Sequence, residues 1–161
     1  MYGATMHTAT RDPLVDLVAA ITEVRRLWES PQIRRRFTEL LGRRVELSVI
    51  RTLAAVQRST APDPGVRDVA EALHIDNSTA SRFVDQAVAD GLVERSVSSV
   101  DRRRCVLTLT SKGLALLERV TLARTELMAA LTAGWQDADV AVLAAGLERL
   151  AGGISALEQQ P

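Results

Sequence analysis

The chain has 161 residues, of which 47% are hydrophobic and 3% aromatic, so it suits one helical domain packed mainly through aliphatic side chains. Twenty basic residues balance twenty acidic ones, and this zero net charge counts against a domain that binds nucleic acid through bulk positive charge. No uninterrupted apolar run of about 18 residues is present, and the polar N-terminus lacks the pattern of a signal peptide. With one cysteine and no membrane partner expected, the sequence predicts a cytoplasmic protein without an intramolecular disulfide.

Three helical segments are predicted before a break in the pattern. Apolar residues recur at helical spacing over 12–30, over 31–42 and over 45–58. The second segment begins at a Ser-Pro pair, which is a common restart signal, and it ends at a glycine. The stretch STAPDPG at 59–65 is the clearest break, and it is interpreted as a loop because the segment after it is too short to fold alone.

A helix-turn-helix followed by a β-hairpin is predicted after this loop. The apolar spacing over 66–73 predicts a short helix, and the stretch Asp-Asn-Ser-Thr offers good N-cap residues for a second helix at about 77–90. Gly91 ends that helix, and two extended runs predict a hairpin at about 94–109 with an arginine-rich tip. A hairpin placed directly after a helix-turn-helix makes a winged helix, in which the second helix is the recognition helix.

Two more helices are predicted after the hairpin. One runs from Leu114 toward Trp135, and the last covers 137–157. The predicted fold class is therefore mainly α with a small β-hairpin wing, as a winged helix-turn-helix flanked by N- and C-terminal helices.

The segment VRDVAEALHIDNSTASRFVDQAVADGLVERSVSSVDRRRCVLTLTSKG, residues 66–113, resembles the MarR family, the multiple-antibiotic-resistance regulators. The shared order is a short helix, a hydroxyl-rich start to the recognition helix, the closing DGLVER, an Asp-Arg-Arg wing tip and a strand ending in LTxxG. The resemblance implies one MarR-like domain over 1–161, with dimerisation helices at 12–44 and 114–161 around a DNA-binding part at 45–113. It also allows for a small-molecule effector near the junction of these parts.

Candidate DNA-binding side chains lie on the polar side of the recognition helix and at the wing tip. Short hydroxyl side chains near a helix N-terminus suit a helix in the major groove, and Arg82 is the candidate for a guanine edge or a phosphate. At the tip, Arg103 is the candidate for minor-groove insertion or a phosphate contact, and Asp101 can pair with its guanidinium. An ordinary polar helix face and a surface ion pair are the alternative interpretations. The predicted set is Ser78, Thr79, Ser81, Arg82, Gln86, Asp101, Arg102 and Arg103.

The terminal helices carry more apolar positions than a small winged-helix domain can cover. Residues 14–27 and 140–157 are therefore predicted to bury against a second copy of the chain. A two-fold dimer presents two recognition helices about one DNA turn apart, so the expected partner is double-stranded DNA with an inverted repeat. The predicted dimerisation residues are Leu14, Leu17, Val18, Ile21, Leu143, Leu147 and Leu150.

Cys105 shares a strand face with Leu107 and Leu109, so it is predicted to be a small core residue. A redox sensor is the alternative, because neighbouring arginines could lower the pKa of the thiol. His7 and His74 belong to no ligand cluster, so no metal site and no cofactor are expected.

Two further sets of residues leave alternatives open. Trp28, Phe37 and Trp135 could line an effector pocket, although aromatics at helical spacing more often pack in a core. The arginine run 34–36 is more often a solvated face than a binding site.

Two other function classes compete with a DNA-binding regulator. A winged helix can also serve as a protein–protein interaction module without sequence-specific DNA binding. An enzyme is not expected, because no nucleophile with a spaced histidine, glycine loop or convergent carboxylate pair is found in the sequence.

Overall fold

The computed structural model describes residues 12–97 and 105–158, and within these ranges it contains seven helices and one two-stranded sheet. The predicted mainly α fold with a small β-hairpin wing is confirmed. In chain order the elements are α1 (Pro13–Trp28), α2 (Pro31–Leu41), α3 (Leu47–Arg58), α4 (Val66–Leu73), α5 (Asn77–Ala89), β1 (Val93–Val97), β2 (Cys105–Leu109), α6 (Ser111–Leu131) and α7 (Asp137–Glu158).

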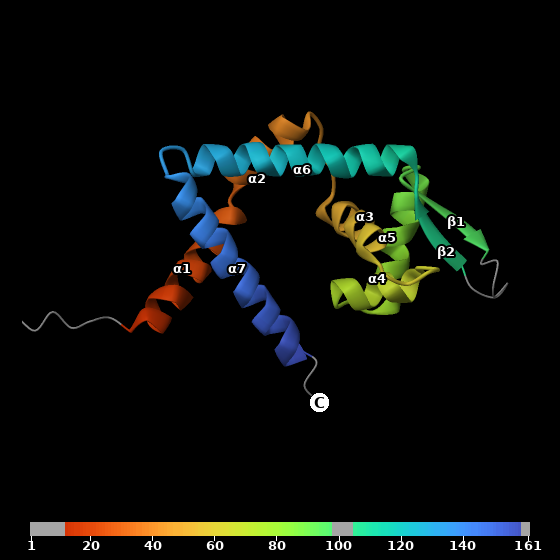
Figure 1. Cartoon of the computed structure of the whole chain (residues 1–161). Helices are drawn as coiled ribbons and strands as arrows, with labels where there is room; N and C mark the ends of the chain where they lie inside the picture. The colour runs from red at the N-terminus through yellow and green to blue at the C-terminus, as the bar shows by residue number, and fades with distance from the viewer. Residues whose placement is uncertain (1–11, 98–104, 159–161) are drawn as a thin grey trace, which may run out of the picture.

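The long helix α6 connects two groups of elements (Figure 1). At the end where α6 begins lie α3, α4, α5 and the hairpin, and at the end where it stops lie α1 and α7. Helix α2 packs along α6, and α3 also contacts it. The helix-turn-helix and the wing therefore form one end of the molecule, and the terminal helices form the other.

Side-chain caps define the start of the first two helices. The Asp12 carboxylate accepts a hydrogen bond from the Leu14 N–H at 2.9 Å, and the Ser30 hydroxyl accepts one from the Ile33 N–H at 3.3 Å. A proline follows each cap at the first helical position, where its missing N–H is not needed. Gly42 ends α2 with φ 74°, a left-handed conformation that glycine adopts at little cost.

The core lies between α2, α3, α4, α5, the hairpin and α6. The third helix begins at Leu47 rather than at the predicted residue 45, because Glu46 is its extended N-cap. Val93 and Leu107 bring the base of the hairpin into the same cluster. The largest fully buried side chains are Leu41, Leu53, Leu92, Leu107, Val69, Val84, Val93, Val120 and Thr52.

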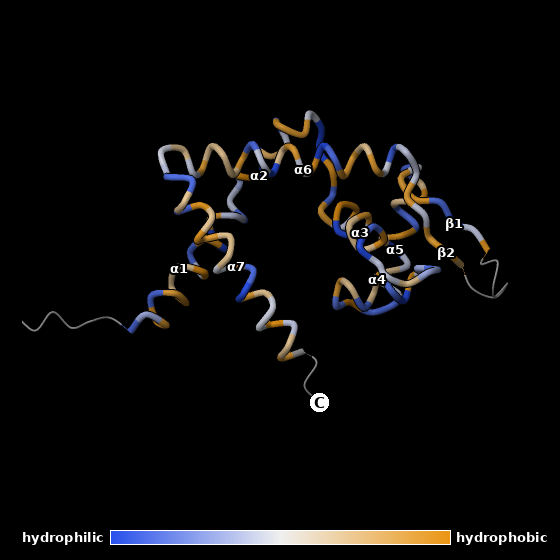
Figure 2. The backbone as a smooth tube through the Cα atoms, in the orientation of Figure 1, coloured by the Kyte–Doolittle hydropathy of each residue, from blue (hydrophilic) through white to orange (hydrophobic). Residues whose placement is uncertain are grey.

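Helix α7 is almost without cover in the single chain. Every described side chain from 137 to 157 is exposed, although the helix is hydrophobic over much of its length (Figure 2). The stretch Asp137–Leu157 is long and apolar enough, at a mean hydropathy of 1.5, to cross a membrane. Glu148 and Arg149 lie near its middle, where each charge would be costly in a bilayer. A helix of this composition needs a partner surface.

The first turn of α6 lies directly against the turn between α5 and β1. A Cβ on Gly113 would overlap the carbonyl oxygen of Leu92. The Thr110 N–H donates a hydrogen bond to the same carbonyl at 3.1 Å. Only glycine permits this approach, because the obstacle is backbone and cannot rotate away.

We expect Gly113→Ala to lower the free energy of unfolding by about 2 kcal/mol or more, because the added methyl pushes α6 off the Leu92 carbonyl. Chemical denaturation at fixed protein concentration measures the change. Ser111→Ala is the matched control in the same turn, since Ser111 is exposed, and its effect should stay within about 0.5 kcal/mol. Equal stability of the two variants would contradict the packing described here.

Candidate nucleic-acid interface

Helix α5 has one buried face and one polar face. Ala80, Val84 and Ala87 are fully buried against the core. On the opposite face Ser78, Arg82, Asp85 and Gln86 are exposed, whereas Thr79 and Ser81 are half-buried at the edges. The described structure therefore brings the five predicted residues of the recognition helix to its accessible side and boundary.

The first turn of α5 is organised by Asp76. Its carboxylate accepts hydrogen bonds from the Thr79 N–H at 2.9 Å, from the Thr79 hydroxyl at 2.8 Å and from the Ser78 hydroxyl. The hydroxyl of Ser78 contributes most to lowering the pKa of Asp76 far below its ordinary value, followed by the N–H and hydroxyl of Thr79. Because both hydroxyls donate their protons to the carboxylate, each hydroxyl oxygen can only accept a hydrogen bond from a further partner.

The middle of the polar face carries one arginine without an ion pair to another described residue. Arg82 is exposed, and no hydrogen bond or ion pair joins its guanidinium to the rest of the described chain. One turn later, the Gln86 amide donates to the Asp90 carboxylate at 3.1 Å. Arg82 is thus available to bind a base edge or a phosphate. Gln86 would first have to break its hydrogen bond to Asp90.

The hairpin stands beside α5 and is joined to it by an ion pair. The strands are antiparallel, with Val93 opposite Leu109 and Val97 opposite Cys105. Arg95 on β1 lies 2.8 Å from Asp85 on α5, and the two side chains are 34% and 56% exposed. Such a pair contributes only about 0–1 kcal/mol to stability. The predicted wing-tip residues Asp101, Arg102 and Arg103 lie outside the described residues.

The prediction that Cys105 is a core residue is wrong, because its side chain is exposed. Leu107 on the same strand face is 1% exposed and Leu109 is half-buried, so the shared face was identified correctly. Cys105 lies toward the tip, opposite Val97, which is 66% exposed. At Cys105 the hairpin has already extended past the core. The side chain therefore points to the same face as Leu107, but no core residues cover it.

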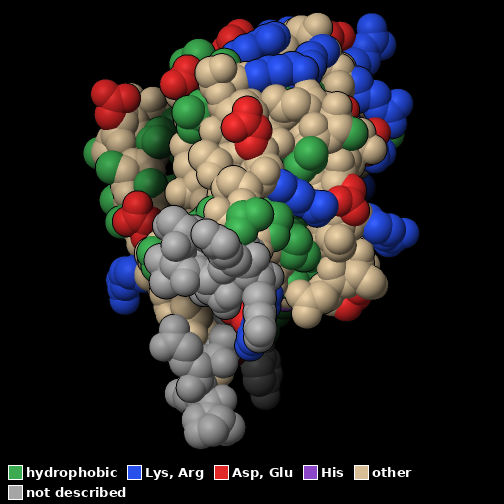
Figure 3. All heavy atoms as spheres, turned by 90° about the vertical axis from the view of Figure 1, so that its right-hand side faces the viewer, with side chains coloured by type: hydrophobic (Ala, Val, Ile, Leu, Met, Phe, Trp, Pro, Cys, Tyr) green, Lys and Arg blue, Asp and Glu red, His purple; other side chains and the backbone are tan. Residues whose placement is uncertain are grey.

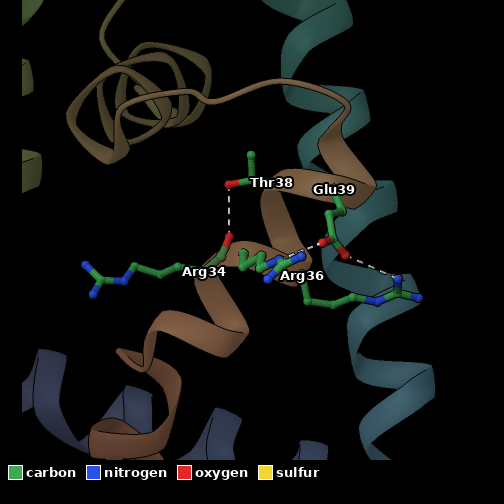
Figure 4. A network of polar contacts seen from close by, with 5 residues as sticks. Arg34, Arg36, Thr38 and Glu39 are labelled. Atoms are coloured by element: carbon green, nitrogen blue, oxygen red, sulfur yellow. Dashed lines mark hydrogen bonds and ion pairs between the residues drawn. The ribbon is translucent and has the colours of Figure 1, made fainter.

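The arginine run at 34–36 is a solvated face of α2. Figure 4 shows two of its arginines around Glu39, with the Arg34 side chain extending away from them. Arg35 and Arg36 lie 3.1 Å and 3.7 Å from the Glu39 carboxylate. The Thr38 hydroxyl donates to the Arg34 carbonyl within the helix at 2.9 Å. All of these contacts lie within α2, so they do not join the arginines to another element.

The three aromatic residues considered for an effector pocket do not share an enclosed site. Phe37 packs against the core, whereas Trp28 and Trp135 are 43% and 51% exposed. Two of the three side chains are therefore open to solvent in the single chain.

A basic hollow that the sequence did not indicate lies between the α2–α3 connection and the C-terminal end of α5. Its volume is about 470 Å³, and Arg43, Arg44 and Lys112 are among its lining residues. Lys and Arg side chains gather along the upper edge of the face in Figure 3. The Lys112 ammonium donates to the Asp90 carbonyl at 2.5 Å, so one of the three cations already caps α5.

A model of the MarR family matches residues 45–104, which span the helix-turn-helix and β1. Over these residues the chain is similar to the MarR family. That family consists of DNA-binding transcription regulators and not of enzymes. The resemblance seen in the sequence is confirmed by this match.

The similarity to a curated relative is confined to one part of each chain. HTH-type transcriptional regulator BilQ of Clostridium symbiosum is 36% identical over 58 residues. The match covers 36% of this chain and 40% of the relative. The chain therefore matches less than half the length of that relative.

Solved structures of MarR-family proteins share the fold over most of the chain. A MarR family protein from Bacillus stearothermophilus is 20% identical with a TM-score of 0.70, covering 88% of this chain and 97% of the other. Wild-type MarR from E. coli is 23% identical with a TM-score of 0.62, covering 86% and 97%. A mutant of MepR from S. aureus bound to an oligodeoxyribonucleotide is 20% identical with a TM-score of 0.57, covering 89% and 99%. At these identities the likeness shows the common fold, flanking helices included.

We expect Asp76→Ala to lower the melting temperature at pH 7, because the first turn of the recognition helix loses its N-cap acceptor. The folded-state pKa of Asp76 is lowered, so the stabilisation by its carboxylate is present above the ordinary value of 3.8 and is lost as the pH falls below it. The melting temperatures of wild type and variant should therefore converge in acid. Asp76→Asn is the control, since asparagine also caps helices well. A difference that is the same at pH 3 and pH 7 would contradict the role of the ionised carboxylate.

Proposed function

We propose that the chain is a homodimeric transcription regulator that places α5 in the major groove of an inverted-repeat operator and its wing in the adjacent minor groove. The observation that carries the proposal is the polar face of α5, where Arg82 is exposed on a helix that packs against β1. The MarR-family match supports DNA binding by this part of the chain.

The polar face of α5 offers both kinds of hydrogen-bonding group that base edges require. An arginine can bond to the O6 and N7 of guanine in the major groove, and Arg82 suits this role. The acceptor side of Ser78 and Thr79 suits the amino groups of adenine or cytosine. Together they would read a short run of base pairs in each half-site, with Ser81 and Gln86 at the margins of the contact.

The wing supplies the second contact. Arg103 would enter the minor groove or bind a phosphate, with Arg102 on the backbone and Asp101 holding Arg103. These residues belong to the proposal through the sequence pattern of the family. The described base of the hairpin, between Val93 and Leu109, stands beside the recognition helix as that role requires.

Exposed apolar side chains support a dimer through α1 and α7. The seven predicted dimerisation residues are between 39% and 68% exposed in the single chain. Burying one such leucine is worth about 1.5–3 kcal/mol, so a second copy that covers both helices would be strongly favoured. A dimerisation part at 12–44 and 114–161 around a DNA-binding part at 45–113 is the division that we propose. A small-molecule effector at their junction would act by changing the distance between the two recognition helices.

We expect a selection from random DNA duplexes to enrich an inverted repeat whose binding weakens steeply as salt rises. Arg82→Ala should weaken binding by about 1–3 kcal/mol and relax the preference at one base pair of each half-site. Arg103→Ala should weaken binding more evenly across sequences. Arg124→Ala is the control, because it removes the same charge from an exposed position on α6.

Failure to enrich any sequence, with equal weak binding by wild type and both variants, would contradict this function. Such a result would favour a winged helix that binds another protein.

We expect Leu147→Glu to convert the dimer to a monomer or to raise its dissociation constant, because the charge would be buried against the partner helix. Light scattering after size exclusion, over a range of concentrations, measures the mass. Leu47→Glu is the matched control, since Leu47 is 61% exposed at the start of α3, and it should leave the dimer intact. A wild-type chain that is monomeric at micromolar concentration would refute the dimer.

A further inference from the structure

One cross-strand pair of the hairpin is held from both sides. Arg95 on β1 is the register partner of Leu107 on β2. The Arg95 guanidinium lies 2.8 Å from the Asp85 carboxylate on α5. On the other edge, the Leu107 N–H donates a hydrogen bond to the Pro64 carbonyl at 2.7 Å. The pair is thus joined to the recognition helix on one side and to the loop at 59–65 on the other.

This pair lies where the hairpin leaves the core. Val93, two residues before Arg95 on the same strand face, is 1% exposed. Val97, two residues after it, is 66% exposed, and Cys105 opposite Val97 is exposed as well. Apolar packing therefore orients the hairpin up to this level, and among the described residues the contacts of Asp85 and Pro64 join it here to α5 and to the loop.

The loop contact depends on a glycine. A Cβ on Gly65 would lie 3.1 Å from the Cys105 carbonyl oxygen, which is closer than most such contacts. The Gly65 N–H donates to the Asp68 carboxylate at 2.7 Å, which fixes the loop to the start of α4. The loop is thereby anchored to the helix-turn-helix and can support β2 from outside.

We propose that these contacts, which we term the wing clamp (Asp85, Arg95, Leu107 and Pro64), set the direction of the wing relative to the recognition helix. Asp85 and Arg95 are then positioning residues for DNA binding rather than contacts to DNA. The inference rests on the proposed function, because the angle between α5 and the wing matters when the two enter neighbouring grooves of one duplex. At its exposure the ion pair adds little to stability, so its effect is on geometry.

The Asp85–Arg95 ion pair also changes the charge that the surface of α5 presents to DNA. An unpaired Asp85 carboxylate on the polar face of α5 would repel the phosphates that run between the two grooves. The guanidinium of Arg95, which is in contact with this carboxylate, neutralises its charge. The clamp therefore both orients the wing and balances the charge of Asp85. Exchanging the two charges between positions 85 and 95 should retain both effects.

Footprinting on the selected operator tests the clamp. We expect Arg95→Ala to lose or shift protection of the minor groove from hydroxyl radicals, to keep protection of guanine N7 in the major groove, and to bind roughly three- to tenfold more weakly. The charge-reversed double variant, Asp85→Arg with Arg95→Asp, has the net charge of wild type and should recover most of the minor-groove protection. Glu94→Ala, on the outward face of the same strand, is the control.

Two results would overturn the proposal. Unchanged minor-groove protection in Arg95→Ala would show that the pair does not orient the wing. A reversed pair that binds no better than Arg95→Ala, together with an unaffected Asp85→Asn, would make Arg95 itself the DNA contact.

A measurement without DNA separates this inference from the proposed function. Cys105 is exposed on the hairpin and is the single cysteine, so it accepts a spin label, and Ala89→Cys on α5 provides a second one. The labelled protein is diluted with unlabelled protein so that only distances within one chain are recorded. We expect the distance distribution to broaden or shift in Arg95→Ala and to return in the reversed pair. An identical distribution in all three proteins would refute the clamp, even if operator binding is confirmed.

Discussion

The turn between α5 and β1 rests on the first turn of α6, and this contact joins the recognition helix to the rest of the chain. The Thr110 N–H and hydroxyl donate to the carbonyl oxygens of Leu92 and Gly91 at 3.1 Å and 2.8 Å. The Lys112 ammonium donates to the Asp90 carbonyl. These donors satisfy the carbonyl of the α5 C-cap residue and the two carbonyls of the turn that follows it, and the positive end of the α6 dipole meets the negative end of α5. A movement of α6 would therefore act directly on α5, the proposed recognition helix.

The same chemistry recurs at two other helix ends. Arg119 on α6 donates to the carbonyl of Leu41 at the end of α2, and Arg51 on α3 donates to the carbonyl of Leu73 at the end of α4, at 3.2 Å. In each case a cation from one helix satisfies the orphan carbonyl of another. Helix α6 provides two of these three caps, seven residues apart. It is therefore tied at one point to the N-terminal helices and at another to the recognition helix, which suits a connection between dimer and DNA-binding parts.

The spacing of apolar residues, together with capping residues, prolines and glycines, was enough to predict the order of the elements. Local signals such as Ser30-Pro31 and Gly91 mark where helices begin or end. Contacts between residues far apart in sequence left no such signal. Cys105 alternates correctly with Leu107, yet its exposure depends on where the core ends, which a single strand does not encode. Arg95 shares the inner strand face with Val93, and a charge in that position could have indicated a partner on α5. The loop sequence STAPDPG likewise gave no sign that the Pro64 carbonyl accepts a hydrogen bond from Leu107 on β2.

The terminal helices show how far one chain can stabilise this fold. Helix α7 includes Gly146, Gly152 and Gly153, each of which costs about 1 kcal/mol relative to alanine in a helix. Helical propensity rarely sustains an isolated helix in water without packing of an apolar face. Apart from the helix's own neighbouring backbone, nothing in the described chain lies within 4 Å of the position where a Cβ would stand on these three glycines, so the helix is open to close approach by another surface. The glycines and the exposed leucines of α7 are consistent with the proposed packing of a partner helix on them. In the proposed dimer, the stability of α7, and through α6 the placement of α5, would depend on the partner.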